Sequence, residues 1–167
     1  MDFRREDRMV TVFPGSFDPF TLGHFDVLCS ALGFSDKVIV AVGYNHLKKG
    51  FFTIEQRMEI IRDSIAPLIA SGADIEVVSY GSLTVDLCRE TGSKLIVRGI
   101  RLSSDFENET VIASANRRMC PEIRTVFVPA DSNHSFISST VVRDILVNGG
   151  DSSIFLCPGV DITKFRK

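Results

Sequence analysis

The feature that most constrains the fold is a series of five short apolar runs, rich in valine and isoleucine, separated by stretches with helical signals. Strands buried on both faces of a parallel sheet are typically continuous in this way, without alternation of apolar and polar residues. Alternating strand and helix units favour a parallel sheet covered by helices on both faces. We therefore predict an α/β fold: a single-domain, Rossmann-like, doubly wound parallel five-stranded sheet with helices on both faces. The expected strands are residues 10–13, 38–43, 75–79, 95–97 and 125–128.

Local end signals place helices between these strands. Thr53 and Gln56 have the spacing of a capping box at a helix start. Ser82 can cap a further helix, which Gly92 would end, and the two glycines at 149 and 150 would stop the last one. The expected helices are residues 25–32, 53 to about 66, 82–92, 105–119 and 138–148.

The length and composition are those of one domain. A chain of 167 residues with 44% apolar residues can bury one core. We expect a flexible N-terminal extension at residues 1–8 and a single domain over residues 9–167. The net charge of −2 argues against a nucleic-acid-binding protein, because such proteins usually carry a basic surface. Any affinity for phosphate must then come from a local site.

The cysteines and the first residues favour a cytoplasmic location. The four cysteines lie far apart without a C-x-x-C pair, so we expect no zinc or redox motif. Three of them should pack as small apolar side chains, and reduced thiols are typical of the cytoplasm. The charged first residues lack the apolar stretch of a signal peptide. No apolar run approaches the about 20 residues needed to cross a bilayer, so we expect no membrane partner.

The turn between the first expected strand and helix, with the sequence FPGSFDPFTLGH at residues 13–24, is the strongest functional signal. Backbone N–H groups at a helix N-terminus are unpaired and attract phosphate. Gly15 and Gly23 let the backbone approach a ligand closely, and His24 adds a donor for a phosphate oxygen. An ordinary turn with a surface histidine is the commoner meaning of an isolated Gly-His pair. The whole string, however, favours a phosphate site.

Unusual polar residues also follow the other expected strands. Ligands in open α/β sheets bind beyond the carboxyl ends of the strands, near the switch point. We therefore expect these segments to converge with the turn that ends in His24. They are residues 44–49, 80–84, 98–101 and 131–140.

Three of these segments carry groups suited to anionic ligands, and each has a plainer alternative. Arg98, at the end of a buried strand, needs a partner. This partner is either an anionic ligand or a nearby carboxylate of the protein. Lys48 and Lys49 suit a phosphate, although a solvated loop pair is the commoner meaning of adjacent lysines. Ser138 and the hydroxyls around it suit a phosphate tail at a helix start, or Ser138 is simply an N-cap.

Several of these motifs together resemble a known family. The form Thr21-Leu22-Gly23-His24 resembles the His-x-Gly-His signature of the nucleotidyltransferase superfamily. Preceded by Pro-Gly-Ser-Phe-Asp-Pro, it is similar to the signature of bacterial phosphopantetheine adenylyltransferases. The resemblance continues at Phe52-Thr-Ile-Glu-Gln-Arg57, at Arg98-Gly-Ile-Arg101 followed by Asp105-Phe-Glu, and at Ile137-Ser-Ser-Thr-Val-Val-Arg143. It covers nearly the whole chain, from about residue 10 to residue 155.

The resemblance implies roles for particular residues. His24 would be the catalytic transition-state stabiliser, and Lys48 and Arg98 would hold the attacking phosphate. Those implied to bind ATP are Ser16, Phe17, His24, Gly99, Ile100, Arg101, Glu109, His134, Ser135, Phe136, Ile137, Ser138, Ser139 and Thr140. The residues implied to bind the acceptor are Ser16, Lys48, Thr84 and Arg98. Thr84 is explained nearly as well as a buried helix residue, and no residue is implied to bind a metal directly.

Four positions depart from the family pattern. Ser16 stands where most members have threonine, and Thr140 where they have serine; both keep the hydroxyl. His134 replaces a frequent tryptophan and Asn108 a usual tyrosine, so we expect the packing around the adenine to differ.

The activity implied by the resemblance is adenylyl transfer from ATP to 4′-phosphopantetheine, which gives dephospho-coenzyme A and pyrophosphate. It also implies Mg²⁺ carried with ATP, a homohexamer and inhibition by coenzyme A. One alternative is another small-molecule nucleotidyltransferase, acting on nicotinamide mononucleotide or making CDP-alcohols; these usually have histidine at the position of Thr21. A second alternative is a non-catalytic nucleotide or coenzyme A sensor, which could lose His24 or Lys48, yet both are present.

Overall fold

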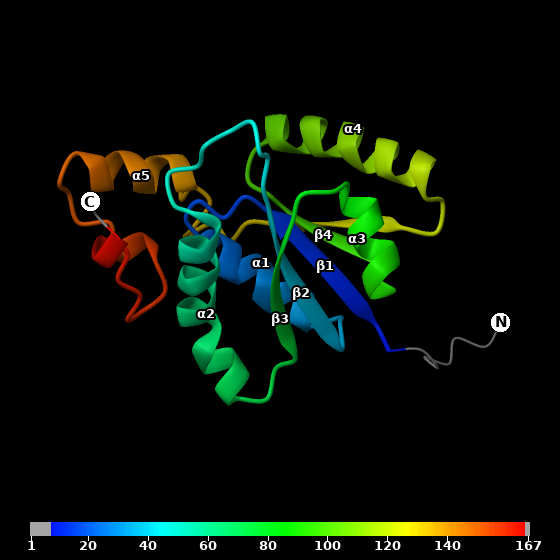
Figure 1. Ribbon diagram of the computed structural model, residues 1–167, viewed down its shortest axis with the longest axis horizontal. Helices are drawn as coiled ribbons and strands as arrows, with labels where there is room; N and C mark the ends of the chain where they lie inside the picture. The colour runs from blue at the N-terminus through cyan, green and yellow to red at the C-terminus, as the bar shows by residue number, and fades with distance from the viewer. Residues whose placement is uncertain (1–7, 166–167) are drawn as a thin grey trace.

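The computed structural model describes residues 8–165, so most of the expected extension at residues 1–8 lies outside the described residues. A parallel five-stranded sheet runs through the centre of the molecule in the order β3-β2-β1-β4-β5 (Figure 1). This confirms the predicted fold class and all five expected strands. They are β1 (Val10–Gly15), β2 (Lys37–Gly43), β3 (Ile75–Tyr80), β4 (Leu95–Ile100) and β5 (Arg124–Pro129).

Helices cover both faces of the sheet. On one face, Leu28, Ile60 and Leu146, from three different helices, pack in one apolar cluster with Phe13 of β1. On the other face, Val85 packs against the sheet in a second apolar cluster. The longer helix of this face lies beside the helix that carries Val85 (Figure 1). The helices are α1 (Leu22–Leu32), α2 (Ile54–Ala70) and α5 (Ser139–Val147) on the first face, and α3 (Thr84–Thr91) and α4 (Ser103–Met119) on the second.

Strand β2 shows why its sequence is continuously apolar. Val38, Val40 and Val42 belong to the first cluster, whereas Ile39 and Ala41 belong to the second. All five side chains are buried. Successive residues of a strand point to opposite faces, so a strand with a core on each side needs an apolar residue at every position.

Strands β1 and β4 separate toward their carboxyl ends. They pair only at Thr11–Leu95 and Val12–Ile96, although β1 stays paired with β2 as far as Gly15 and β4 with β5 as far as Ile100. This is the switch point of the sheet, where ligands bind in folds of this kind. Because β4 continues to Ile100, Arg98 lies within this strand and faces the opening between β1 and β4. The sequence predicts instead that Arg98 follows the strand.

The helix boundaries differ from the predicted ones by a few residues. Helix α1 begins directly after Thr21, so His24 lies in its first turn. The predicted cap at Ser82 is wrong, because α3 begins after Leu83. Gly92 ends α3 with a positive φ of 69°, as expected. The described chain closes with two short 3₁₀ turns, Ser153–Phe155 and Thr163–Phe165.

Three of the four cysteines, Cys88, Cys120 and Cys157, are buried, and Cys29 is exposed. Burial raises the pKa of the Cys88 and Cys157 thiols to about 11, so both pack as neutral groups, as expected. Within residues 8–165, no helix has the length and apolar character needed to span a membrane.

Candidate active site

His24 is fixed by the turn that precedes it. Its Nδ1 accepts a hydrogen bond from the backbone N–H of Thr21 at 3.0 Å, so the neutral ring carries its proton on Nε2. Burial, followed by the charges of Arg101 and Arg98, lowers the pKa of His24 to about 3. The ring is therefore uncharged at neutral pH and presents one N–H donor.

Aromatic packing supports this histidine from behind. Phe17 has a φ of 45°, which is unusual for a residue other than glycine. Its ring lies 5.1 Å from the ring of His24 and 5.5 Å from that of Phe20, centroid to centroid. A Cβ at Gly15 would lie 2.9 Å from the Phe17 ring, so a side chain at Gly15 would displace it. Phe17, although implied to contact ATP, is thus mainly a packing residue beneath His24.

A first cavity of about 350 Å³ opens between the ends of β1 and β4 and the start of α5. Its lining joins the turn that ends in His24 to segments that lie far away in the sequence. Most of the residues implied to bind ATP line it: Ser16, Phe17, His24, Gly99, Arg101, Glu109, Ile137, Ser138, Ser139 and Thr140. The structure therefore brings three of the four motifs together in this cavity; the motif at residues 52–57 lines a different one.

Arg98 is paired with Glu109 of α4. Arg98 Nε and Nη2 donate to the two carboxylate oxygens of Glu109 at 2.8 and 2.6 Å, and Nη1 donates to the carbonyl of Pro14. The salt bridge that the sequence left as an alternative is thus present. Because both side chains also line the cavity, the pair places the planar guanidinium of Arg98 in the opening between β1 and β4.

Arg101 joins the end of β4 to the segment before α5. Its Nη1 donates to the carbonyl of Ile137 at 3.2 Å, and its Nε lies 3.6 Å from a carboxylate oxygen of Asp105. Asp105 also accepts the backbone N–H groups of Arg101 and Leu102, at 3.1 and 3.2 Å. Asp105 belongs to the Asp-Phe-Glu motif, but sequence reasoning assigned it no role.

The three hydroxyls at the start of α5 all have protein partners. Ser138 Oγ accepts the backbone N–H of Val141 at 3.2 Å, which confirms the N-cap. Ser139 Oγ donates to the carbonyl of Pro19 at 2.7 Å, and Thr140 Oγ1 accepts from Arg143 at 3.2 Å. Ser138 and Thr140 act as acceptors in these contacts, so each keeps its own hydroxyl proton for a ligand in the cavity.

A second cavity of about 300 Å³ adjoins the first on the side of α3 and α4. It is lined by Ser16, Thr84 and Arg98, three of the four residues implied to bind the acceptor. Thr84 is half-buried, and its hydroxyl is 2.9 Å from that of Tyr80. The wall common to the two cavities consists of Pro14, Gly15, Ser16, Arg98 and Glu109.

Lys48, the fourth of these residues, lies elsewhere. It is exposed and lines a third, wider cavity of about 1030 Å³ together with Lys49 and Tyr44. Ser16 lines all three cavities, so the third opens beside the other two. The structure does not bring Lys48 into the same cavity as Arg98.

Four residues implied to bind ATP, namely Ile100, His134, Ser135 and Phe136, do not line the first cavity. His134 Nδ1 is 2.6 Å from a carboxylate oxygen of Asp26 on α1, and Ser135 Oγ donates to the carbonyl of Ser132 at 3.3 Å. Phe136 is 63% exposed. His134 and Ser135 thus contact the protein, and Phe136 is largely exposed to solvent.

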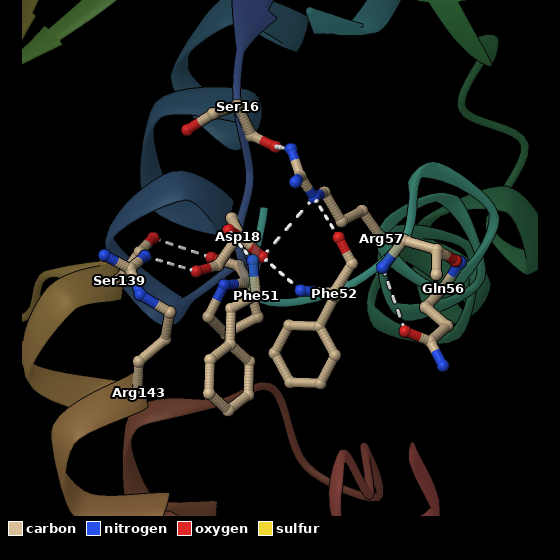
Figure 2. A network of polar contacts seen from close by, with 10 residues as sticks. Ser16, Asp18, Phe51, Phe52, Gln56, Arg57, Ser139 and Arg143 are labelled. Atoms are coloured by element: carbon tan, nitrogen blue, oxygen red, sulfur yellow. Dashed lines mark hydrogen bonds and ion pairs between the residues drawn. The ribbon is translucent and has the colours of Figure 1, made fainter. Parts of the chain in front are cut away.

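Sequence reasoning also missed a buried network behind the turn. Asp18, Arg57 and Arg143 connect the turn to α2 and α5 (Figure 2). All three are part of the motifs that carry the family resemblance. Their presence there was a signal, but nothing local in the sequence shows that they meet.

Comparison with known proteins defines the class. The cytidylyltransferase-like family model matches residues 12–145, which include most of the residues that line the first two cavities. A bifunctional NMN adenylyltransferase/ADP ribose pyrophosphatase from Francisella tularensis superposes with a TM-score of 0.68 at 23% identity, over 94% of this chain and 47% of that one. A Vibrio parahaemolyticus protein titled a nicotinate-nucleotide adenylyltransferase reaches 0.66 at 16% identity, over 92% and 96%. The fold and the matched family define a cytidylyltransferase-like nucleotidyltransferase.

Sequence relatives define the family more closely. Three proteins named phosphopantetheine adenylyltransferase match nearly the full length. The Rhizobium rhizogenes protein is 46% identical over 91% of this chain and 92% of its own, and the Bordetella avium protein is 44% identical over 92% and 90%. That of Flavobacterium psychrophilum is 41% identical over 90% and 97%. The chain belongs to the phosphopantetheine adenylyltransferase family.

Proposed function

We propose that the protein transfers the adenylyl group of ATP to 4′-phosphopantetheine, releasing pyrophosphate and dephospho-coenzyme A. The observation that carries this proposal is the wall shared by the first two cavities. Most residues implied to bind ATP line one cavity, three of the four residues implied to bind the acceptor line the other, and Ser16 and Arg98 belong to both. In an in-line displacement at the α-phosphorus, the attacking phosphate oxygen of the acceptor lies opposite the leaving pyrophosphate, so the two substrates must bind side by side at a common wall.

The nucleophile needs no general base. The attacking group is a phosphate oxygen of 4′-phosphopantetheine, which is largely ionised at neutral pH because the second pKa of a phosphate monoester is about 6. His24 cannot serve as a base through Nε2, since Nδ1 accepts the Thr21 N–H and the proton lies on Nε2. His24 instead donates to an oxygen of the α-phosphate as negative charge develops there.

The remaining residues hold the attacking phosphate and the leaving pyrophosphate. Arg98 holds the attacking phosphate and shares its guanidinium between that phosphate and Glu109. Lys48 reaches the same phosphate from the third cavity; lysine, as a point charge on a mobile stem, suits this role. Ser138, Thr140 and the N-terminus of α5 hold the leaving pyrophosphate.

Mg²⁺ is proposed to arrive with ATP. In the described part of the chain, no three acidic, histidine or cysteine side chains gather in a metal site. The two carboxylates of the first cavity, Asp105 and Glu109, are paired with Arg101 and Arg98. These residues fit a Mg²⁺ ion that would be carried by the substrate and not by protein side chains. Such an ion would offset part of the charge of the triphosphate.

A pyrophosphate-release assay with ATP and a panel of acceptors tests the function. We expect release with 4′-phosphopantetheine and none with nicotinamide mononucleotide or without an acceptor. Release with nicotinamide mononucleotide alone would assign the protein to another nucleotidyltransferase activity. Ligand binding without release would assign it to a non-catalytic sensor. The homohexamer, the cytoplasmic location, inhibition by coenzyme A and the absence of nucleic-acid or membrane partners remain predictions.

A further inference from the structure

A buried carboxylate joins the turn at Ser16–Thr21 (the phosphate turn) to the loop that carries Lys48, residues 44–52 (the Lys48 loop). Asp18 lies in the turn and is 8% exposed. Its two carboxylate oxygens accept the backbone N–H groups of Phe51 and Phe52 at 2.8 and 2.9 Å (Figure 2). The end of the Lys48 loop is therefore attached directly to the phosphate turn.

Arg57 of α2 strengthens the same junction from the other side. It is 6% exposed, and its Nε lies 3.4 Å from the Asp18 carboxylate. Nε donates to the carbonyl of Phe52 at 2.9 Å, and Nη1 donates to the carbonyl of Ser16 at 3.2 Å. One guanidinium thus holds both the turn and the loop (Figure 2).

Gly50 leaves the space that this guanidinium occupies. A Cβ at Gly50 would lie 1.4 Å from Arg57 Nη2. Any side chain at Gly50 would therefore displace the end of Arg57 or move the loop itself. Gly50 is two residues from Lys48, so the fit of the loop against Arg57 also determines the position of the Lys48 backbone.

The turn is held on its opposite side by α5. Arg143 Nη1 donates to the carbonyl of Asp18 at 2.6 Å, and Ser139 Oγ donates to the carbonyl of Pro19 at 2.7 Å. The turn consequently cannot shift toward the loop without breaking contacts with the helix that is proposed to hold pyrophosphate. Asp18 and Arg57 are the side chains that fix the loop to this held turn.

Stability alone does not account for a buried ion pair at this place. A buried pair often contributes little to stability compared with apolar residues of the same volume, because both charges lose their hydration. This pair fixes two backbone segments that carry two different site residues, Ser16 and Lys48. We propose that Asp18 and Arg57 are positioning residues: they hold the Lys48 loop against the phosphate turn and so place Lys48 at the acceptor phosphate. This inference rests on the proposed adenylyl transfer.

A double-mutant experiment tests it. Asp18→Asn is made in the wild-type protein and in Lys48→Ala, and the KM for 4′-phosphopantetheine and the Kd for ATP are measured. In the wild-type background, Asp18→Asn raises the acceptor KM about tenfold, the scale of one charge-assisted hydrogen bond. In the Lys48→Ala background the same change raises it less than about twofold, because coupled residues are not additive. The Kd for ATP stays within about twofold in both backgrounds.

The outcomes separate the possible failures. An equal rise of the acceptor KM in the two backgrounds would overturn the inference, because a merely structural role does not depend on Lys48. Absence of pyrophosphate release by the wild-type protein would overturn the proposed function instead. Asp63→Asn is the matched control. Asp63 lies on the surface of α2, the helix that carries Arg57, and forms an ion pair with Lys164. Its loss leaves the acceptor KM unchanged.

Two further measurements hold even if Asp18→Asn folds poorly. Arg57→Lys keeps the charge but not the planar fork, so it reproduces the Lys48-dependent rise of the acceptor KM. We expect hydrogen exchange of the Phe51 and Phe52 amides, which donate to Asp18, to be slow in the wild-type protein and faster in Arg57→Lys. If Arg57→Lys leaves both the acceptor KM and the exchange of these amides unchanged, the positioning role is refuted.

Discussion

The phosphate turn and the Lys48 loop meet at Asp18, but they are built in opposite ways. Phe17, Phe20 and Thr21 are each 1% exposed, and His24 is held by the Thr21 N–H. In the Lys48 loop, residues 45–49 are all exposed. Donors that are in place before the substrate arrives cost no further ordering during the reaction, whereas an exposed lysine loses side-chain entropy when it binds. From this difference we expect the turn to supply catalysis and the loop to supply acceptor capture.

The test with the largest expected effect on activity removes the side chain of His24, the hydrogen-bond donor that follows the turn. We expect His24→Ala to lower turnover by about 10²- to 10³-fold, the usual cost of one lost donor to a developing oxyanion. The Kd for ATP should change much less, because the donor acts mainly in the transition state. Steady-state kinetics and calorimetry measure the two quantities. Turnover near that of the wild type would remove His24 from the mechanism.

A second test separates Arg98, which belongs to the shared wall, from Arg101, which lines only the first cavity. Arg98→Ala should weaken 4′-phosphopantetheine binding chiefly, and Arg101→Ala should weaken ATP binding chiefly. Each lost charge-assisted hydrogen bond costs about 1.5–3 kcal/mol, or about 10- to 150-fold in affinity. Titration of each variant with each ligand yields four affinities. The same profile for both variants, or the reverse one, would contradict the division. Arg89→Ala, which loses an exposed ion pair with Asp86, is the control.

A smaller effect is expected from the loop. Lys48→Ala should weaken acceptor binding by about tenfold, at the lower end of the range for a charged hydrogen bond, and leave ATP binding unchanged. Lys48→Arg should restore little, because a planar fork does not replace a point charge. Lys49→Ala is the neighbouring control. Unchanged acceptor affinity and turnover in Lys48→Ala would show that this lysine is only a solvated loop residue.

The last expected effect concerns stability at low pH. His24 has a folded-state pKa of about 3 against an ordinary value of 6.5. Between these values the unfolded chain binds a proton that the folded one does not, so stability is complete above pH 6.5 and falls as the pH decreases toward 3. We expect His24→Gln to lose less free energy of unfolding than the wild type between about pH 7 and about pH 4. Urea denaturation at several pH values measures this; equal losses would place the His24 ring in a more hydrated site.

Local patterns predicted the elements well and their junctions poorly. The continuous apolar run at Val38–Val42, the glycine that ends α3 and the cap at Ser138 were all confirmed, because each depends on a few neighbouring residues. Arg98 was expected after β4 but lies within it, since pairing with Phe127 of β5 extends the strand. Ser82 was expected as a cap, but Leu83 is the cap. The roles assigned to the site residues stay predictions until the variants are measured.

The sequence by itself determined the order of strands and helices, the class of the sheet and the motifs that resemble those of the family. Periodicity and helix caps are local properties, so they can be recognised one segment at a time. Only the tertiary structure decided that Arg98 pairs with Glu109, that two adjoining cavities share one wall, and that Lys48 lies outside both. It also joined Asp18 to Arg143, 125 positions away. Such contacts follow from the strand order and from burial, which bring distant segments together by packing that no local pattern encodes.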